Sequence, residues 1–227
     1  STTSVDPVGE IGNVCERHRL WLHVDAAHAG SAGILPELRH ILDGCERADS
    51  FVVNPHKWMF TPIDFSAFYC RRPEVLKQAF SLTPEYLKTA EDDGVTNYMD
   101  YGIQLGRRFR ALKFWMVVRY FGVEGLRERL REHIRLGQMF VSWIEDNPNF
   151  SLMAPAQFST VCFRFKGSDA DNQTLLDRVN GSGKAFLSHT KLNDQLTIRF
   201  TVGNLRTKEK HVRQAWELVQ LVAAELN

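Results

Sequence analysis

Short apolar runs, separated by a helix-compatible segment, mark the first part of the chain. The runs cover residues 21–24, 50–53 and 65–70, and a helix-compatible segment over 35–42 lies between the first two. Apolar runs of four to six residues with an intervening helix are typical of buried strands joined by crossover helices. The pattern predicts an α/β fold with a central parallel sheet, and we expect this first domain to occupy residues 1–147.

The middle of the chain changes from loop-like to helical. Residues 81–105 show no sustained period and contain Pro84, Gly94 and Gly102. A loop of this length is usually functional or disordered. From Arg107 onward, apolar positions recur at three- and four-residue steps as far as Gly122, and a second helical pattern continues to about Ile144. We therefore expect two helices with a break near Gly122.

A different pattern begins near Pro148. Apolar and polar side chains alternate over residues 161–165 and again over 196–200. This period of two predicts half-buried strands of an antiparallel sheet. A final helix with one apolar stripe follows, and Thr207 is its expected N-cap. The pattern predicts a small α+β domain over residues 148–227.

Composition excludes several classes of protein. The 28 Lys and Arg residues nearly balance the 27 Asp and Glu residues, and a net charge of +1 gives no reason to expect nucleic acid or an anionic membrane as a partner. No apolar run approaches the ~20 residues of a membrane span, and the first residues do not resemble a secretory signal. The scattered cysteines predict free thiols in a cytoplasmic protein, without a disulfide framework or a metal site.

Two predicted strands end in residues that could carry chemistry. Asp25 follows the first strand, and Asn54, Pro55, His56 and Lys57 follow the second. Ligands of open α/β sheets bind beyond the carboxyl ends of the strands. Alone, such an aspartate is more often a turn or helix cap, and such a lysine is most often solvated. Together they match a pyridoxal phosphate (PLP) site, where a lysine bonds the aldehyde and a carboxylate keeps the ring nitrogen protonated.

Three segments resemble the signatures of one enzyme family. Residues 23–30 (HVDAAHAG), 54–58 (NPHKW) and 105–113 (LGRRFRALK) resemble, in order and spacing, motifs of the group II, fold-type I PLP-dependent amino-acid decarboxylases. The similarity continues through residues 211–216 in the last helix, and it is greatest to the aromatic-L-amino-acid decarboxylases. The resemblance implies the C-terminal part of a fold-type I large domain followed by a small C-terminal domain.

The resemblance also implies roles for individual residues. Lys57 would bond the PLP aldehyde, Asp25 would hold the pyridinium nitrogen, and Ala27 would pack on one face of the ring. His56 would contact the cofactor phosphate or the substrate, and Asn54 would help to hold the phosphate. A buried histidine with satisfied hydrogen bonds is the alternative for His56.

Two further residues are implied to act where two subunits of a homodimer share their active sites. Tyr86, in the long loop, would reach the other subunit's site and protonate the α-carbon after CO2 leaves, although it could also simply anchor the loop. Related aldehyde synthases carry phenylalanine there, so Tyr86 favours amine formation. Gly106 would line the substrate pocket and leave room for a bulky ring. His28 departs from the tyrosine usual in the family, which could alter substrate preference.

These residues predict a PLP-dependent carboxy-lyase that converts an aromatic L-amino acid (tryptophan, tyrosine, phenylalanine or dopa) to its amine and CO2. One alternative is an aldehyde synthase of the same family, recognisable by hydrogen peroxide and ammonia among its products. Another is a non-catalytic relative that binds PLP or partners only. The combination of Asp25, Lys57 and Tyr86 argues against the second.

The resemblance covers only the C-terminal half of such an enzyme. The small-residue loop that binds the phosphate and the histidine that stacks on the ring would lie upstream of Ser1, and the chain lacks an initiator methionine. Half of a sheet exposes unpaired edges and apolar faces. We therefore expect these residues to need the N-terminal half of the same protein, either as a separate nicked chain or within one longer polypeptide.

Overall fold

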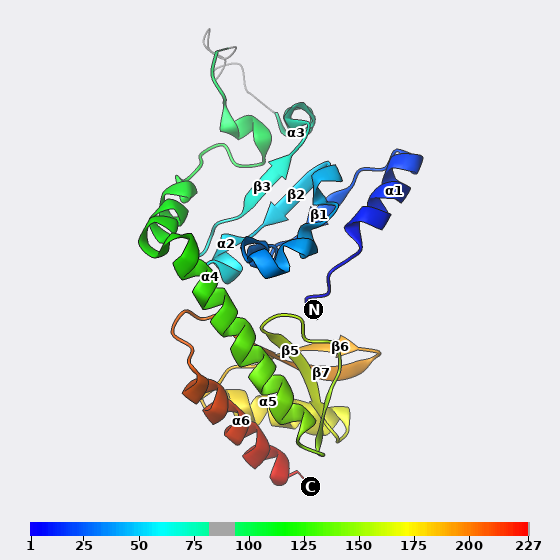
Figure 1. The fold of residues 1–227 in the computed structure, drawn as a ribbon, viewed down its shortest axis with the longest axis vertical. Coiled ribbons are helices and arrows are strands. Elements are labelled where there is room, and N and C mark those ends of the chain that lie inside the picture. The colour runs from blue at the N-terminus through cyan, green and yellow to red at the C-terminus, as the bar shows by residue number, and fades with distance from the viewer. Residues whose placement is uncertain (82–93, 227) are drawn as a thin grey trace. The chain divides into compact units, whose positions relative to one another are not determined.

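A computed structural model describes residues 1–81 and 94–226, which divide into two compact units (Figure 1). The N-terminal unit comprises Pro7–Gly33 and Glu37–Tyr120. The C-terminal unit comprises Ser1–Asp6, Ile34–Pro36 and Phe121–Asn227. No helix within the described ranges combines the length and apolarity that a membrane span requires.

The N-terminal unit is built on a three-stranded sheet of order β1-β2-β3. Strands β1 (His23–Asp25) and β2 (Ser50–Val53) are parallel, as predicted, and β3 (Ala67–Cys70) runs antiparallel to β2. The expectation of an all-parallel sheet is therefore wrong for the third strand. Only the one-turn helix α2 (Pro55–Trp58) lies between β2 and β3, whereas a parallel crossover normally uses a longer helix.

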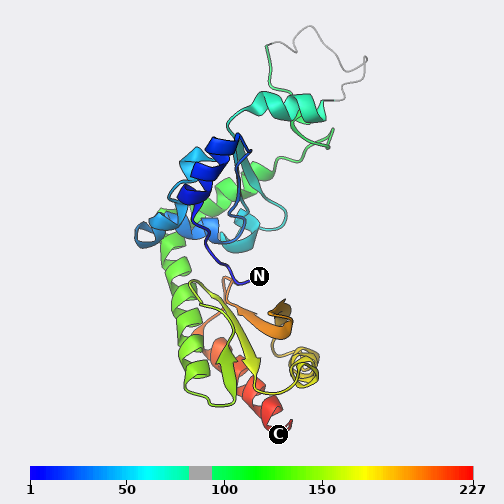
Figure 2. The ribbon, with the colours of Figure 1, turned by 90° about the vertical axis from the view of Figure 1, so that its right-hand side faces the viewer.

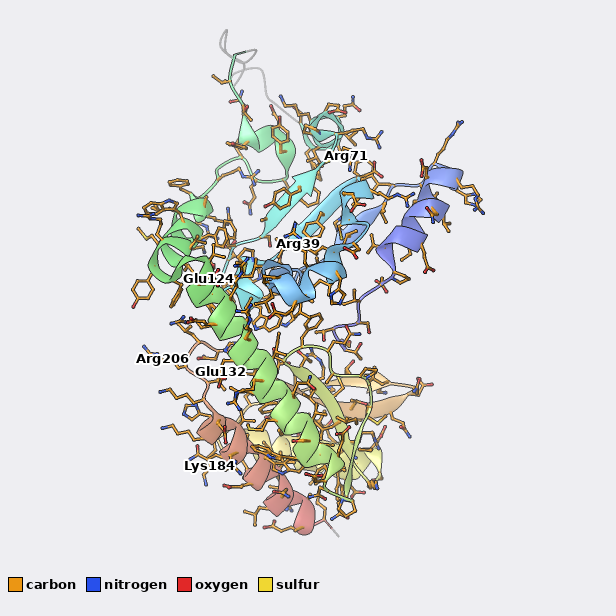
Figure 3. All side chains as sticks on the ribbon, in the orientation of Figure 1. Arg39, Arg71, Glu124, Glu132, Lys184 and Arg206 are labelled. Carbon is orange, nitrogen blue, oxygen red and sulfur yellow. The ribbon has the colours of Figure 1, made fainter. Side chains whose placement is uncertain are left out.

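Helices and 3-10 turns surround this sheet. The helix-compatible segment over 35–42 forms a 3-10 helix, η2, and not an α-helix. Arg71, labelled in Figure 3, follows β3 and donates to the carbonyl oxygens of Glu46 and Ala48, which ties the strand end to η3. The elements of this unit outside the sheet are α1 (Val8–His18), η1 (Ala29–Ile34), η2 (Pro36–Leu42), η3 (Cys45–Arg47), α2, α3 (Pro73–Phe80) and η5 (Tyr98–Tyr101).

Helix α4 (Arg110–Glu145) is broken where the sequence predicts a break. Gly122 has φ 65° and ψ 174°, a conformation that glycine adopts without a steric penalty. The part of α4 after Gly122 belongs to the C-terminal unit, where Leu136, Phe140 and Ile144 enter the core. Residues 121–147 thus group with the C-terminal unit in this chain, and the domain boundary at 147/148 stays a prediction.

The C-terminal unit contains a four-stranded antiparallel sheet of order β4-β5-β7-β6. The predicted alternating strands pair with each other, with Val161 opposite Phe200 and Phe163 opposite Ile198. Every residue of β5 is buried, so the expectation of a half-buried strand is wrong there, because both faces are covered: Phe163 enters the core, and Arg164 on the other face is bonded to Asp169 and Gly167. The strands are β4 (Phe150–Leu152), β5 (Thr160–Phe165), β6 (Ser188–Leu192) and β7 (Gln195–Thr201).

Three helices complete the core of this unit: the second part of α4, α5 (Asp169–Gly181) and α6 (Glu209–Ala224). Helices α4 and α6 lie side by side in both views (Figures 1 and 2), and Arg135 forms an ion pair with Glu209 between them. The N-cap of α6 is Lys208, so the prediction of Thr207 is wrong by one residue. The Lys208 backbone N–H donates to Nδ1 of His211 at 3.1 Å, which caps the helix one residue later.

Candidate active site

The parallel pairing of β1 and β2 brings their carboxyl ends together. Asp25 lies opposite Val52, the Ala26 N–H donates to the Val52 oxygen, and the Asn54 N–H donates to the Ala27 oxygen, both at 3.0 Å. The segment after β1 and the segment after β2 are therefore hydrogen-bonded neighbours. This is the arrangement that the sequence predicts for Asp25 and Lys57, and both side chains are exposed in this chain.

A tight turn fixes the residues that follow β1. The Asp25 carboxylate accepts a hydrogen bond of 2.9 Å from the backbone N–H of Ala27, which is only 8% exposed. Gly30 comes so close to the sheet that an added Cβ would lie 2.8 Å from Cβ of Ala26 and 3.3 Å from Cγ2 of Val53. Glycine at this position lets the turn pack against β2, so the orientation of Asp25 depends on it.

The residues after β2 are set on a single helical turn. Asn54 is the N-cap of α2 with Pro55 at its first position, and the Lys57 N–H donates to the Asn54 oxygen at 2.8 Å. Trp58 is fully buried, which confirms that it is a core residue. His28 stacks on the Trp58 ring with centroids 5.0 Å apart and planes 4° apart. The turn that carries Lys57 is thus anchored by Trp58 against the β1 side of the site.

His56 is held by the backbone of one residue, Phe65. Its Nδ1 lies 3.0 Å from the Phe65 nitrogen, whose N–H donates to it, and 2.6 Å from the Phe65 oxygen. Both contacts involve Nδ1, so the partner that dominates determines which ring nitrogen carries the proton. Nε2 is then the atom of the ring available to a ligand beside Lys57.

A charged cluster adjoins this peptide, and the sequence interpretation missed it. The Asp64 carboxylate pairs with Nε of Arg110 at 3.0 Å, with Arg108 at 3.2 Å and with Nζ of Lys113 at 3.8 Å. The hydrogen bond from Arg110 lowers the pKa of Asp64 below its usual value, and the charges of Arg108 and Arg110 lower it further. The dense positive charge of residues 105–113 was the available signal for a buried or half-buried acidic partner.

One buried polar atom tests whether the site fits PLP. Oδ1 of Asn54 is buried and has no hydrogen-bond partner among the described residues. An amide offers both an acceptor oxygen and a donor nitrogen, so this group has unmet capacity where a ligand would lie. The unsatisfied oxygen can accept from a hydroxyl or N–H group of a ligand, and the NH2 of the same amide can donate to a phosphate. The Asp25 carboxylate on the neighbouring strand end suits a protonated ring nitrogen, and the Lys57 amine suits an aldehyde. The residues present fit the cofactor.

The structure does not test the roles predicted for Tyr86 and Gly106. Tyr86 lies outside the described residues. Gly106 is exposed, and an added Cβ would meet no atom of this chain within 4 Å, so its place in a substrate pocket stays a prediction. Arg164 and Arg199 lie in the C-terminal unit and are bonded there, Arg164 to Asp169 at 2.6 Å and Arg199 to the Ser1 oxygen at 2.7 Å.

Comparison with known proteins gives a consistent assignment. Residues 1–166 match the family described as the pyridoxal-dependent decarboxylase conserved domain. The chain belongs to this family. Its relatives place it in the aromatic-L-amino-acid decarboxylase group, and the α/β architecture agrees with fold-type I.

Two curated relatives and one solved structure show the range of the group. The chain is 43% identical to phenylacetaldehyde synthase of Arabidopsis thaliana, over 100% of the chain and 48% of that protein. It is also 43% identical to aromatic-L-amino-acid decarboxylase of Sus scrofa, over 100% of the chain and 47% of that protein. The crystal structure of Oryza sativa TDC with PLP and tryptamine superposes with a TM-score of 0.92 at 40% identity, covering 100% of this chain and 49% of that one. The chain therefore spans about half the length of these relatives.

Proposed function

We propose that this chain is the lysine- and aspartate-bearing part of a PLP-dependent decarboxylase that converts an aromatic L-amino acid to its amine and CO2. The observation that carries the proposal is the pairing of β1 and β2, which places Asp25 and Lys57 on adjacent strand ends. Relatives named as decarboxylases of tryptophan, tyrosine and aromatic L-amino acids support the substrate class.

PLP, when bound, supplies a sink for the electron pair left on the α-carbon when CO2 departs. The Asp25 carboxylate would hold a proton on the ring nitrogen, and the turn through Ala27 keeps that carboxylate oriented. The Lys57 amine would hold the cofactor through its aldehyde. His56, through Nε2, and the Asn54 amide would orient the phosphate or the substrate, and Ala27 would pack against the ring.

The proposal extends to partners outside this chain. Tyr86 would deliver a proton to the α-carbon in the site of the partner subunit of a homodimer, and Gly106 would leave space for the aromatic ring there. The N-terminal half of the same protein would complete the sheet and the phosphate site. All four cysteines lie within the described residues as free thiols, which suits the cytoplasmic location that we propose.

The second candidate is an aromatic aldehyde synthase. It is favoured by the 43% identity to a phenylacetaldehyde synthase and by the likeness to 4-hydroxyphenylacetaldehyde synthase of Rhodiola rosea, with a TM-score of 0.88. Such a reaction consumes O2 and water and releases aldehyde, CO2, ammonia and hydrogen peroxide. Tyr86 supports the amine product instead, because a phenol at that position can return a proton to the α-carbon.

Turnover by the intact gene product distinguishes these activities. The protein would be incubated with PLP and with one of four substrates at a time: L-tryptophan, L-tyrosine, L-phenylalanine or L-dopa. The amounts of CO2, amine, aldehyde, ammonia and peroxide would then be measured. We expect equal amounts of CO2 and amine. Lys57→Ala should lower kcat by at least about 10⁴-fold, as loss of a covalent catalytic group does.

Tyr86→Phe is the matched variant for the choice of product, and we expect it to shift the product from amine towards aldehyde. Unchanged turnover in Lys57→Ala would contradict the decarboxylase proposal. Aldehyde, ammonia and peroxide from the unmodified protein would select the second candidate.

A further inference from the structure

The ring of His56 is bonded to the backbone of Phe65, which lies outside helix and strand. Phe65 contacts Nδ1 of His56 through both its nitrogen and its oxygen, and its oxygen also accepts from the His56 backbone N–H at 3.4 Å. Residues 59–66 lie between α2 and β3 outside helix and strand. Side-chain contacts from outside this segment add to the hydrogen bonds that hold the Phe65 backbone.

Those contacts come from the first turns of α4. The Phe65 ring stacks on Phe114 with centroids 5.0 Å apart. The neighbouring Asp64 carboxylate is held by the cluster of Arg108, Arg110 and Lys113. Isolated surface ion pairs contribute little, but several charges on one carboxylate form a network that fixes geometry. The start of α4 and the ring of His56 are thus joined through two consecutive residues.

Arg110 is the dominant member of this cluster. Its side chain is 20% exposed, whereas that of Arg108 is 76% exposed, and its Nε approaches Asp64 more closely than either other cation. Its guanidinium also reaches Oε1 of Gln104 at 3.4 Å. A half-buried guanidinium with two partners is better ordered than an exposed one.

We propose that Arg110 is a positioning residue for His56, acting through Asp64 and the Phe65 peptide to select the ring nitrogen that carries the proton. The inference rests on the proposed function for its catalytic consequence, because His56 precedes Lys57. It assigns a task to the basic segment 105–113 that the cofactor residues leave unexplained. Arg110 itself need not contact cofactor or substrate.

The first measurement reads the His56 ring directly. Nitrogen-15 NMR of the histidines in the cofactor-free intact gene product would be recorded for the unmodified protein and for Arg110→Met, with His56→Asn to assign the signal. We expect one dominant ring-protonation state in the unmodified protein and averaged shifts of both states in Arg110→Met. Arg119→Gln, which changes an exposed arginine of α4 outside the cluster, should leave the signal unchanged.

The second measurement is a double-mutant cycle in kcat/KM. Arg110→Met should lower kcat/KM on the order of 10²-fold when His56 is present, as small displacements of catalytic groups do. In the His56→Asn background the same change should cost less than about threefold, because the group being positioned is gone. Arg119→Gln should stay within about threefold in both backgrounds.

The outcomes separate this inference from the proposed function. Equal losses in both backgrounds with an unchanged His56 signal would overturn it and leave Arg110 as a support of the fold. If Arg110→Met does not fold, Arg110→Lys and Asp64→Asn enter the same cycle, and additive losses would again overturn it. If the enzyme shows no decarboxylation, the proposed function fails, and the NMR result in cofactor-free protein still decides the inference.

Discussion

The two units differ in how far they bury their own apolar side chains. In the C-terminal unit, Phe140 is fully buried, stacks on Phe200 with centroids 4.2 Å apart and packs edge-on against Trp216. In the N-terminal unit, Phe68 and Tyr69 on the sheet are 50% and 62% exposed. One unit is closed around its core, and the other leaves aromatic side chains of its sheet exposed.

The units also differ in what their charged side chains do. Arg164 of the C-terminal unit is 7% exposed and bonded to Asp169 and backbone oxygens, so it is committed to the fold. Asp25 and Lys57 of the N-terminal unit are exposed at paired strand ends. The comparison teaches that the proposed chemistry lies in the unit with the more exposed sheet, whereas the other unit has the more extensive core.

Asp25→Asn should give the largest effect among the variants that compare the two units, below only that of Lys57→Ala. An amide cannot hold a proton on the ring nitrogen as a carboxylate does, so kcat/KM should fall about 10³-fold, within the range of general acid–base effects. Steady-state kinetics of the intact gene product measure this. The exposed Asp43→Asn serves as the control and should have little effect. Equal kinetics for the two variants would show that the chemistry does not lie at the β1 end.

Phe140→Ala tests the claim that the C-terminal unit is closed around its core. Removing this fully buried ring should lower the free energy of unfolding by about 3–5 kcal/mol. Phe186→Ala, at an 85% exposed position, should stay within about 0.5 kcal/mol. Denaturant unfolding with both variants measures the contrast. A cost near zero for Phe140 would contradict the assigned core.

The smallest predicted effect is on the pH dependence of stability. It comes from His133, a buried residue of the C-terminal unit. Burial lowers the pKa of His133, while a hydrogen bond with the Asn204 backbone and the charge of Glu132 oppose the shift. The unfolded chain then binds a proton at higher pH than the folded chain, so stability falls as pH drops below about 6.5.

His133→Gln should flatten that part of the stability curve. The measurement is the free energy of unfolding between pH 5 and 7.5 for both proteins. Parallel curves for the two proteins would rule out this role for His133.

Local pattern was enough to predict elements whose determinants are local. The alternation over 161–165 and 196–200 predicts the β5–β7 pairing, and Gly122 predicts the break in α4. The apolar run over 65–70 predicts β3 but not its direction. Strand direction depends on the connection, and a period of two is the same in parallel and antiparallel sheets.

The sequence could predict those candidate residues that directly follow a predicted strand. Asp25 and Lys57 are found on adjacent ends because parallel strands share an edge. The Asp64–Arg110 pair was not predictable, because 46 residues separate the partners and the link is formed by tertiary packing. The β1 turn shows the same limit, since only the structure reveals the close approach of Gly30 to Val53.

Borohydride reduction followed by peptide mass spectrometry tests the central claim most directly. The intact gene product would be incubated with PLP, reduced and digested, with Lys57→Ala as the matched control. We predict a pyridoxyl adduct on the peptide that contains Lys57 and none on that peptide in the variant. An absent adduct, or one carried by another lysine such as Lys113, would contradict the assignment of the paired β1 and β2 ends as the cofactor site.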